Sequence, residues 1–342
     1  MLHYLSLLSK YRSALMGVAI IVIILFHFSF CFPFPVSDLL SFGYLGVDVF
    51  FFLSGFGLYF SMSKKGTRPS TFYKNRFRKL FPEFWLVLLL AFFIDGDFSA
   101  GSFSGLLWKI FTVGYWIQKP YMFWFISAIV GFYIVFPLYY KAVQRKGLPA
   151  AFWSIGIGLL LMAAYALVMI FCYGNENKGG ILILSIARVP VFFVGSLSAY
   201  LLKNNRDFRL SASVKWLAVL VSILLTVALF YVRLHFPQYL RTCSLSFIPF
   251  IIVAPMICVL LSLAFEHLPQ GISSWLSKVG MISLELYMLH VWFRTLFFYS
   301  FSQSFGRPLA ALVIVVISLL ASILLYQINK LLLQPLFAKL VK

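Results

Sequence analysis

The sequence predicts an all-α protein, a polytopic membrane helical bundle with about ten transmembrane helices, in which residues 1–342 form a single integral-membrane domain. Hydrophobic residues make up 62% of the chain and charged residues 11%, whereas a soluble domain carries roughly 25% charge. Several apolar runs reach the 18 or more residues that a spanning helix needs. These runs do not alternate with polar residues, as the strands of a membrane barrel do.

The spans follow one another between short loops that carry most of the charge. Only the third is short, and it ends at the acidic turn Asp95-Gly96-Asp97. The predicted spans, in order, are about Ala14–Phe32, Phe42–Met62, Pro82–Ile94, Phe123–Tyr140, Phe152–Tyr173, Ile181–Leu202, Val214–Val232, Ser246–Phe265, Val279–Tyr299 and Leu309–Leu332.

The stretch 99–119 is ambiguous, because its apolar run from Leu106 to Ile117 is interrupted by Lys109 and Gly114. If it spanned the membrane, the three cations at 141–146 would fall outside the cell. If it is re-entrant or interfacial, they fall inside, which the positive-inside rule favours. We therefore expect a re-entrant or interfacial segment at residues 99–119.

The basic residues also predict the orientation. With both termini cytoplasmic, 20 Lys and Arg lie in inside loops and tails and six in outside segments, and Arg188 and Arg294 lie within spans. Seven of the inside cations are in the loop Lys64–Lys79. This asymmetry predicts a multi-pass protein of the inner or plasma membrane, with that loop in the cytoplasm.

The net charge of +19 would suggest nucleic acid in a soluble protein. Here the cations lie between apolar spans, where they set orientation and meet anionic lipid headgroups, so we expect membrane lipids and no nucleic acid as partners. The four cysteines show no metal-ligand spacing. No His, Cys and Asp cluster has zinc spacing, and we expect no metal.

One histidine and one aspartate lie inside consecutive predicted spans. His27 is five residues before the outer end of the first span, about 8 Å deep, and Asp48 is six residues into the second, about 9 Å deep. A carboxylate beside an imidazole fixes its tautomer and supports the imidazolium, as general-base catalysis requires. The same pair could instead be a polar contact that only ties two helices together.

The segments around these residues resemble the acyltransferase-3 family of integral membrane acyltransferases. The resemblance covers essentially the whole chain and is strongest over residues 12–85. Its motifs are Gly17, Phe26-His27, the run from Gly43 to Phe56, the run from Phe72 to Pro82, Trp124-Phe125-Ile126, the run from Arg188 to Gly195, and the run from Ser283 to His290.

The resemblance implies acyl transfer from a cytoplasmic thioester, usually acetyl-CoA, to a hydroxyl or amine of a glycan or lipid-linked sugar. It implies that His27 activates the acceptor. The chain departs from the family pattern at Met16, where an arginine is common eleven residues before the histidine. We expect that Arg12, one helical turn earlier, can substitute for it.

The basic loop contains two arginines that match the family pattern, Arg76 and Arg78. Guanidinium groups bind phosphates through paired hydrogen bonds, and coenzyme A carries a pyrophosphate and a 3′-phosphate. We therefore predict that both arginines bind the donor. The alternative is that the loop's charge only sets the topology.

Four further residues are predicted to contact substrate. Arg188 lies within a span and needs a charged partner or a wet cavity. Glu285 and His290 lie on one helix, 140° apart in azimuth, and Tyr287 lies nearer to His290. The alternative for Arg188 and Glu285 is a buried polar group that anchors the bundle.

These residues predict a membrane acyltransferase that moves an acyl group, acetyl in the first instance, from acyl-CoA to a hydroxyl of a surface or lipid-linked polysaccharide. The competing interpretation is a non-enzymatic transporter or flippase of lipid-linked glycan, which also needs intramembrane charge and aromatic surfaces. The set of His27, Asp48 and Arg76 favours the enzyme, because a transporter has no reason to carry those residues at those three positions.

Overall fold

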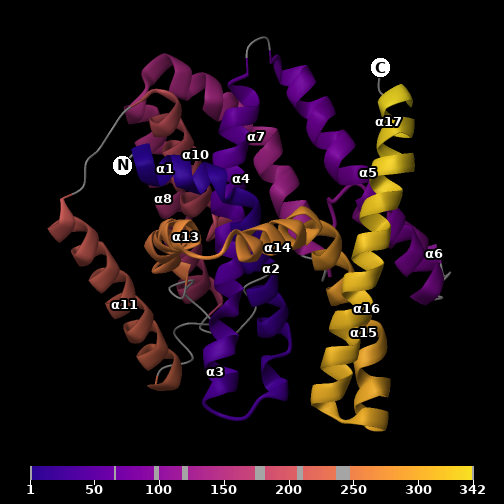
Figure 1. Ribbon diagram of the computed structural model, residues 1–342. Coiled ribbons are helices and arrows are strands. Elements are labelled where there is room, and N and C mark those ends of the chain that lie inside the picture. The colour runs from indigo at the N-terminus through magenta and orange to yellow at the C-terminus, as the bar shows by residue number, and fades with distance from the viewer. Residues whose placement is uncertain are drawn as a thin grey trace.

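The computed structural model describes residues 2–64, 67–95, 100–117, 122–173, 182–205, 211–235 and 247–340. All regular structure in these ranges is helical (Figure 1). The elements are α1 Leu2–Lys10, α2 Arg12–His27, η1 Ser29–Cys31, α3 Val36–Ser41, η2 Phe42–Tyr44, α4 Leu45–Met62, α5 Pro69–Asp95, α6 Ala100–Ile110, α7 Trp124–Lys146, α8 Leu148–Tyr173, α9 Ile183–Ile186, α10 Val189–Lys203, α11 Ala212–His235, α13 Phe250–His267, α14 Gln270–Met281, α15 Ser283–Phe305, α16 Arg307–Ile328, the π-helical turn η4 Asn329–Leu333 and α17 Gln334–Leu340.

In the described residues, six helices are long and apolar enough to cross a membrane, or seven if the bent pair α1 and α2 counts as one span. The prediction of about ten spans is therefore not confirmed. One predicted span falls on α15, which carries Glu285, His290 and Arg294 in place of apolar residues. The six are Val36–Met62, Trp124–Lys146, Leu148–Val168, Ile183–Lys203, Phe250–His267 and Arg307–Phe337.

The stretch predicted to be re-entrant or interfacial contains α6. This helix has 11 residues, or about 16 Å, and is too short to cross a hydrocarbon core of about 30 Å. Trp85 of α5 holds its end by donating from Nε1 to the carbonyl of Ile110 at 3.1 Å. Of the predicted stretch, residues 99, 118 and 119 lie outside the described ranges.

Helix α4 lies at the centre of the bundle, between α2 and α10 (Figure 1). Glycines allow these helices to touch backbone to backbone. A Cβ on Gly55 would lie 2.0 Å from the carbonyl oxygen of Phe192, and one on Gly195 would lie 1.9 Å from that of Phe52. These contacts position the site residues of α4 and α10.

Two ends of the bundle are used as references below. The basic end is the end at the turn between α4 and α5, at the top of Figure 1. Lys64 lies in this turn, and Arg76 and Lys79 follow it in the first part of α5. The distal end is the opposite one, where α2 ends and α3 follows (Figure 1). α2 therefore runs from Arg12 toward the distal end and finishes at His27.

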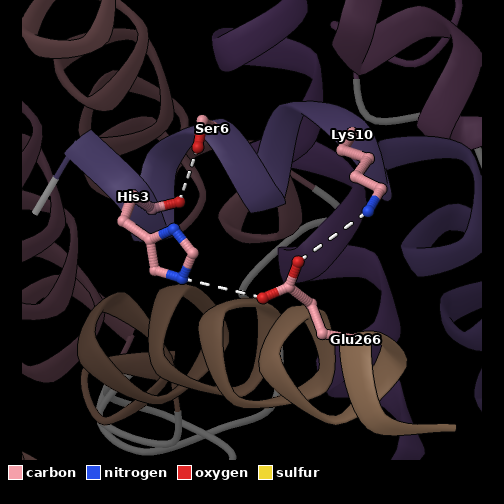
Figure 2. Close-up of polar contacts among 4 residues, drawn as sticks. All are labelled: His3, Ser6, Lys10 and Glu266. Atoms are coloured by element: carbon pink, nitrogen blue, oxygen red, sulfur yellow. Dashed lines mark hydrogen bonds and ion pairs between the residues drawn. The ribbon is translucent and has the colours of Figure 1, made fainter.

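Helix α1 bends away from α2 by 67° and lies across the bundle. Figure 2 shows how it is held against the end of α13. Glu266 pairs with Lys10 at 3.8 Å and with His3 at 3.6 Å, and Ser6 donates to the carbonyl of His3 at 2.7 Å. Exposed pairs of this kind contribute about 0–1 kcal/mol each, so α1 is held mainly by its buried leucines, Leu5, Leu7 and Leu8.

Candidate active site

His27 and His290 form a hydrogen bond between two helices that are far apart in the sequence. Nδ1 of His27 lies 2.8 Å from Nε2 of His290. His27 is half-buried and His290 is fully buried. The prediction placed both residues in the site but did not pair them, because the sequence does not show that α15 packs beside the end of α2.

The tautomers of both rings follow from one backbone contact. Nδ1 of His290 lies 2.7 Å from the carbonyl oxygen of Leu286, and a carbonyl only accepts, so His290 carries its proton on Nδ1. Its Nε2 is then an acceptor and receives the Nδ1 proton of His27. This leaves the lone pair on Nε2 of His27, so the orientation is set for that atom to accept a proton.

Asp48 contacts Arg188 rather than His27. The carboxylate lies 3.3 Å from Nη2 and 3.3 Å from Nε of Arg188, and both side chains are buried. Arg188 also donates to the carbonyl of Leu184 at 3.1 Å, and its guanidinium lies 4.1 Å from the ring centre of Phe247. This ion pair links α4 to the start of α10. The guanidinium of Arg188 contacts a carboxylate, a backbone carbonyl and an aromatic ring at once.

A cavity of about 640 Å³ opens among α1, α2, α4, α5 and α7 at the basic end. Its lining combines four cations with hydroxyl and amide side chains. The residues are Ser9, Arg12, Ser13, Ser54, Phe56, Gly57, Leu58, Phe60, Ser61, Lys64, Thr67, Asn75, Arg76, Lys79 and Tyr133. We call this cavity the basic pocket; Arg76 lines it, and Arg78 is not among its lining residues.

The cations of the basic pocket are held in place by neutral groups. Arg76 donates to Oγ of Ser61 at 2.5 Å, and Arg12 donates from Nε to the carbonyl of Leu53 at 3.1 Å. The Arg12 side chain lies across Gly57, where a Cβ would come within 2.6 Å of its Nη2. Positive charge held without a carboxylate in the lining suits the binding of an anion.

Lys79 reports the same crowding of charge. Burial away from water is the largest cause that lowers the pKa of Lys79, and the nearby charges of Arg76, Lys64 and Arg12 lower it further. An anion bound among these four side chains would offset the repulsion. The basic pocket therefore has the electrostatics of a phosphate site.

An apolar cavity of about 120 Å³ adjoins the basic pocket and shares Ser54 and Tyr133 with it. We call it the apolar tunnel. It is lined by Met16, Ile23, Val47, Phe50, Ser54, Leu80, Phe125, Ile129, Tyr133, Ser283, Leu284 and Tyr287. Ile23 is one helical turn before His27, and the ring of Tyr287 lies 6.2 Å from that of His290, so the tunnel leads from the basic pocket toward the histidine pair.

Tyr287 and Glu285 have different positions on α15. Tyr287 lines the tunnel and its hydroxyl lies 3.4 Å from the carbonyl of Met122. Glu285 is buried, and its carboxyl group interacts with that of Glu83 of α5. Asn329, at the start of the π-helical turn, donates to Glu83 at 2.5 Å.

Two of the residues that contact one another around Glu285 were not predicted from the sequence, Glu83 and Asn329. Glu83 follows Pro82 in the predicted third span, which signalled an intramembrane charge.

Among the described residues, no group of three or more His, Cys, Asp and Glu side chains is placed to hold a metal ion.

Comparison with known proteins now identifies the family. A model described as an acyltransferase domain, that of the acyltransferase-3 family, matches residues 14–327. The chain belongs to this family. It is 25% identical over 277 residues to acyltransferase MdmB of Streptomyces mycarofaciens, an alignment that covers 74% of this chain and 68% of the relative. No solved structure matches the chain.

Family membership supports the sequence-based resemblance and decides between the two functional interpretations. The chain is a membrane acyltransferase, and the non-enzymatic transporter is not supported. The reaction needs an acyl donor and an acceptor. The donor, the acceptor and the roles of the individual residues are the subject of the proposal that follows.

Proposed function

We propose that this protein moves an acyl group, in the first instance acetyl, from acyl-CoA to a hydroxyl of a surface or lipid-linked polysaccharide. The observation that supports this most is that the basic pocket and the apolar tunnel share Ser54 and Tyr133, and that Tyr287 in the tunnel wall lies beside His290. Such a path suits a donor with a highly charged head and a long, thin arm.

The basic pocket matches the charge of the donor. Arg12, Arg76, Lys64 and Lys79 would bind the pyrophosphate and the 3′-phosphate of coenzyme A, since guanidinium groups hold phosphates through two hydrogen bonds at once. Arg12 takes the place of the arginine that the sequence lacks at Met16. Met16 itself lines the tunnel, where an apolar side chain suits the arm of the donor.

The length of the path also fits. Ser54, at the neck between pocket and tunnel, is 11 residues along from Gly43, or about 16 Å. A Cβ on Gly43 would lie 2.9 Å from Cβ of Phe26, so Gly43 marks the level of His27. The pantetheine arm of coenzyme A, counted in bonds from the phosphate oxygen to the sulfur, is as long as the backbone of four residues. Four extended residues span about 14 Å.

The histidine pair supplies the proton transfers. Nε2 of His27 removes the proton from the acceptor hydroxyl as its oxygen attacks the thioester carbon. The tetrahedral intermediate collapses, the carbon–sulfur bond breaks, and the imidazolium returns the proton to the departing thiolate. His290 keeps His27 in the tautomer this requires and stabilises the imidazolium through the Nδ1 hydrogen bond.

The other predicted residues receive supporting roles. Asp48 and Arg188 hold α4 against α10, Tyr287 forms part of the tunnel wall, and Glu285 fixes α15 to α5. Arg78 does not line the basic pocket, and we still propose that it binds the acyl donor. We further propose a single integral-membrane domain in the plasma membrane, with the basic end and both termini in the cytoplasm.

The test uses purified protein in detergent with acetyl-CoA and a panel of glycans. Wild type should release coenzyme A only when an acceptor is present. His27→Ala should lower transfer by about 10²–10⁴-fold while acetyl-CoA still raises its melting temperature. His267→Ala, at the exposed end of α13, is the matched control and should behave as wild type. Normal turnover in folded His27→Ala protein would overturn the proposal.

A further inference from the structure

His27 is the last residue of α2. The four final carbonyls of a helix lack a partner within it, and helix ends fray. The cap residue Phe28 donates back to the carbonyl of Ile24 at 3.1 Å, and the chain then leaves through η1. A proposed base at this position therefore needs support from outside its own helix.

Helix α15 gives that support at two points. His290 contacts the ring of His27, and Arg294, one turn further along α15, donates from Nη1 to the backbone carbonyl of His27 at 3.2 Å. Residues four apart lie on the same face of a helix. One face of α15 thus contacts both the side chain and the main chain of the same residue.

We propose that Arg294 is a positioning residue, which holds the end of α2 so that the ring of His27 stays in line with His290. The inference rests on the proposed role of His27 as the base. Arg294 was noted in the sequence only as a cation within a span. Its side chain is half-buried between the two helices, and a guanidinium has the length and the donors to reach a carbonyl on the neighbouring helix.

Position and charge are the two separable contributions of this arginine. A cation at the carboxyl end of a helix also interacts favourably with the helix dipole, and this alone would stabilise α2 without aligning His27. A loss of alignment has a different signature. Misplacement of a catalytic group by about 1 Å can lower the rate by about 10²-fold. It leaves binding of the donor's phosphates unchanged, because these lie in the basic pocket, at the Arg12 end of α2.

The experiment compares Arg294→Met, Arg294→Lys and the control Arg307→Met. Arg307 is an exposed arginine at the start of the next helix. Arg294→Met should lower kcat by about 10²-fold with the KM for acetyl-CoA within about twofold of wild type. Arg294→Lys keeps a donor that is one bond shorter and should recover most of the loss. Arg307→Met should be unchanged.

Hydrogen exchange at the end of α2 supplies a readout that does not depend on activity. Arg294→Met should speed exchange at the amides of Phe28 and Cys31, which bond to the carbonyls of Ile24 and Phe28, and Arg294→Lys should slow it again. If Arg294→Met does not yield monodisperse protein, Arg294→Gln, which is neutral and two bonds shorter, takes its place and should show the same loss of kcat and the same faster exchange relative to Arg294→Lys.

Three results would overturn the proposal. They are normal kcat in Arg294→Met, a loss of kcat with exchange unchanged, and a raised KM for the acceptor with kcat unchanged, which would make Arg294 an acceptor-binding residue. His27→Ala is assayed in parallel. Normal turnover in that variant would remove the proposed function itself, so the two failures are distinguishable.

Discussion

At the scale of single residues, the proposed chemistry depends on which nitrogen of His27 is unprotonated. The contact between His290 and the carbonyl of Leu286 decides this, and it lies on a helix more than 250 positions away from His27. The sequence predicted that His27 needs an orienting partner, and the structure offers an imidazole for this role where a carboxylate was expected. A neutral partner orients the ring without placing a second full charge in a low-dielectric region.

The role of His290 can be tested by a substitution that preserves its acceptor. In Gln, the amide oxygen can take the place of Nε2, whereas Ala leaves Nδ1 of His27 without a partner. We expect His290→Ala to lower kcat by about 10²-fold and His290→Gln to retain most of the activity. Steady-state kinetics on monodisperse protein would check this, and equal activities in the two variants would argue against the tautomer argument.

Arg76 is the residue at which charge and shape can be separated in the basic pocket. Lysine keeps the charge but loses the planar fork that binds a phosphate through two bonds, and it also loses the contact with Ser61. We expect Arg76→Lys to raise the KM for acetyl-CoA by about tenfold and to leave kcat unchanged. A tenfold change corresponds to the loss of about one hydrogen bond to a charged group. The matched control is Lys109→Arg on α6, away from the pocket. A KM at the wild-type value would leave Arg76 only a topological role.

At the scale of the elements, the central feature is the crossing of α4 and α10. The glycines Gly55 and Gly195 bring the two backbones into contact, and the pair of Asp48 and Arg188 joins the same two helices farther toward the distal end. The interpretation that Asp48 ties helices together was open from the sequence alone. The glycines and the buried ion pair together fix the register of α4 against its neighbour.

This arrangement predicts that Asp48 contributes more to stability than to chemistry. Asp48→Asn removes the charge that balances the buried guanidinium of Arg188, and breaking such a pair costs about 3–5 kcal/mol. We expect a lower melting temperature in detergent for Asp48→Asn, and partial recovery in the double variant Asp48→Asn with Arg188→Gln. If Asp48→Asn keeps the wild-type melting temperature but loses turnover, the prediction from the sequence that Asp48 supports His27 in catalysis is the better one.

The sequence predicted helix positions and several site residues, and it did so for physical reasons. Apolar runs bounded by charge show where helices lie, and an ionisable residue within such a run shows where function is concentrated. His27 was predicted in this way, Arg76 from the basic loop and the family resemblance, and Tyr287 from its place near His290 on one helix. The pairing of residues was not predictable, because His27 with His290 and Glu83 with Glu285 depend on which helices pack together. The predicted number of spans is not confirmed, and α15, whose polar residues lower its hydropathy, is one of the predicted spans that is not among the six.

At the scale of the whole molecule, the positions of the two cavities relate the function to the membrane. The basic pocket opens at the basic end, and the histidine pair lies toward the distal end, where α2 ends. Under the proposed topology, donor and acceptor approach from opposite faces of the membrane and meet at His27. The acyl group would then cross part of the membrane inside the tunnel, while coenzyme A remains on the cytoplasmic side.

The topology is testable at Ser70, an exposed residue at the start of α5 beside the basic end. With a cytoplasmic basic end, a cysteine placed at Ser70 should resist a membrane-impermeant maleimide in intact cells and react after permeabilisation. Leu39, exposed on α3 at the distal end, is the matched position, and Leu39→Cys should react in intact cells. The expectation follows from the 20 inside and six outside cations of the predicted topology. Labelling of Ser70→Cys in intact cells would reverse the orientation and place the basic pocket on the side without acyl-CoA.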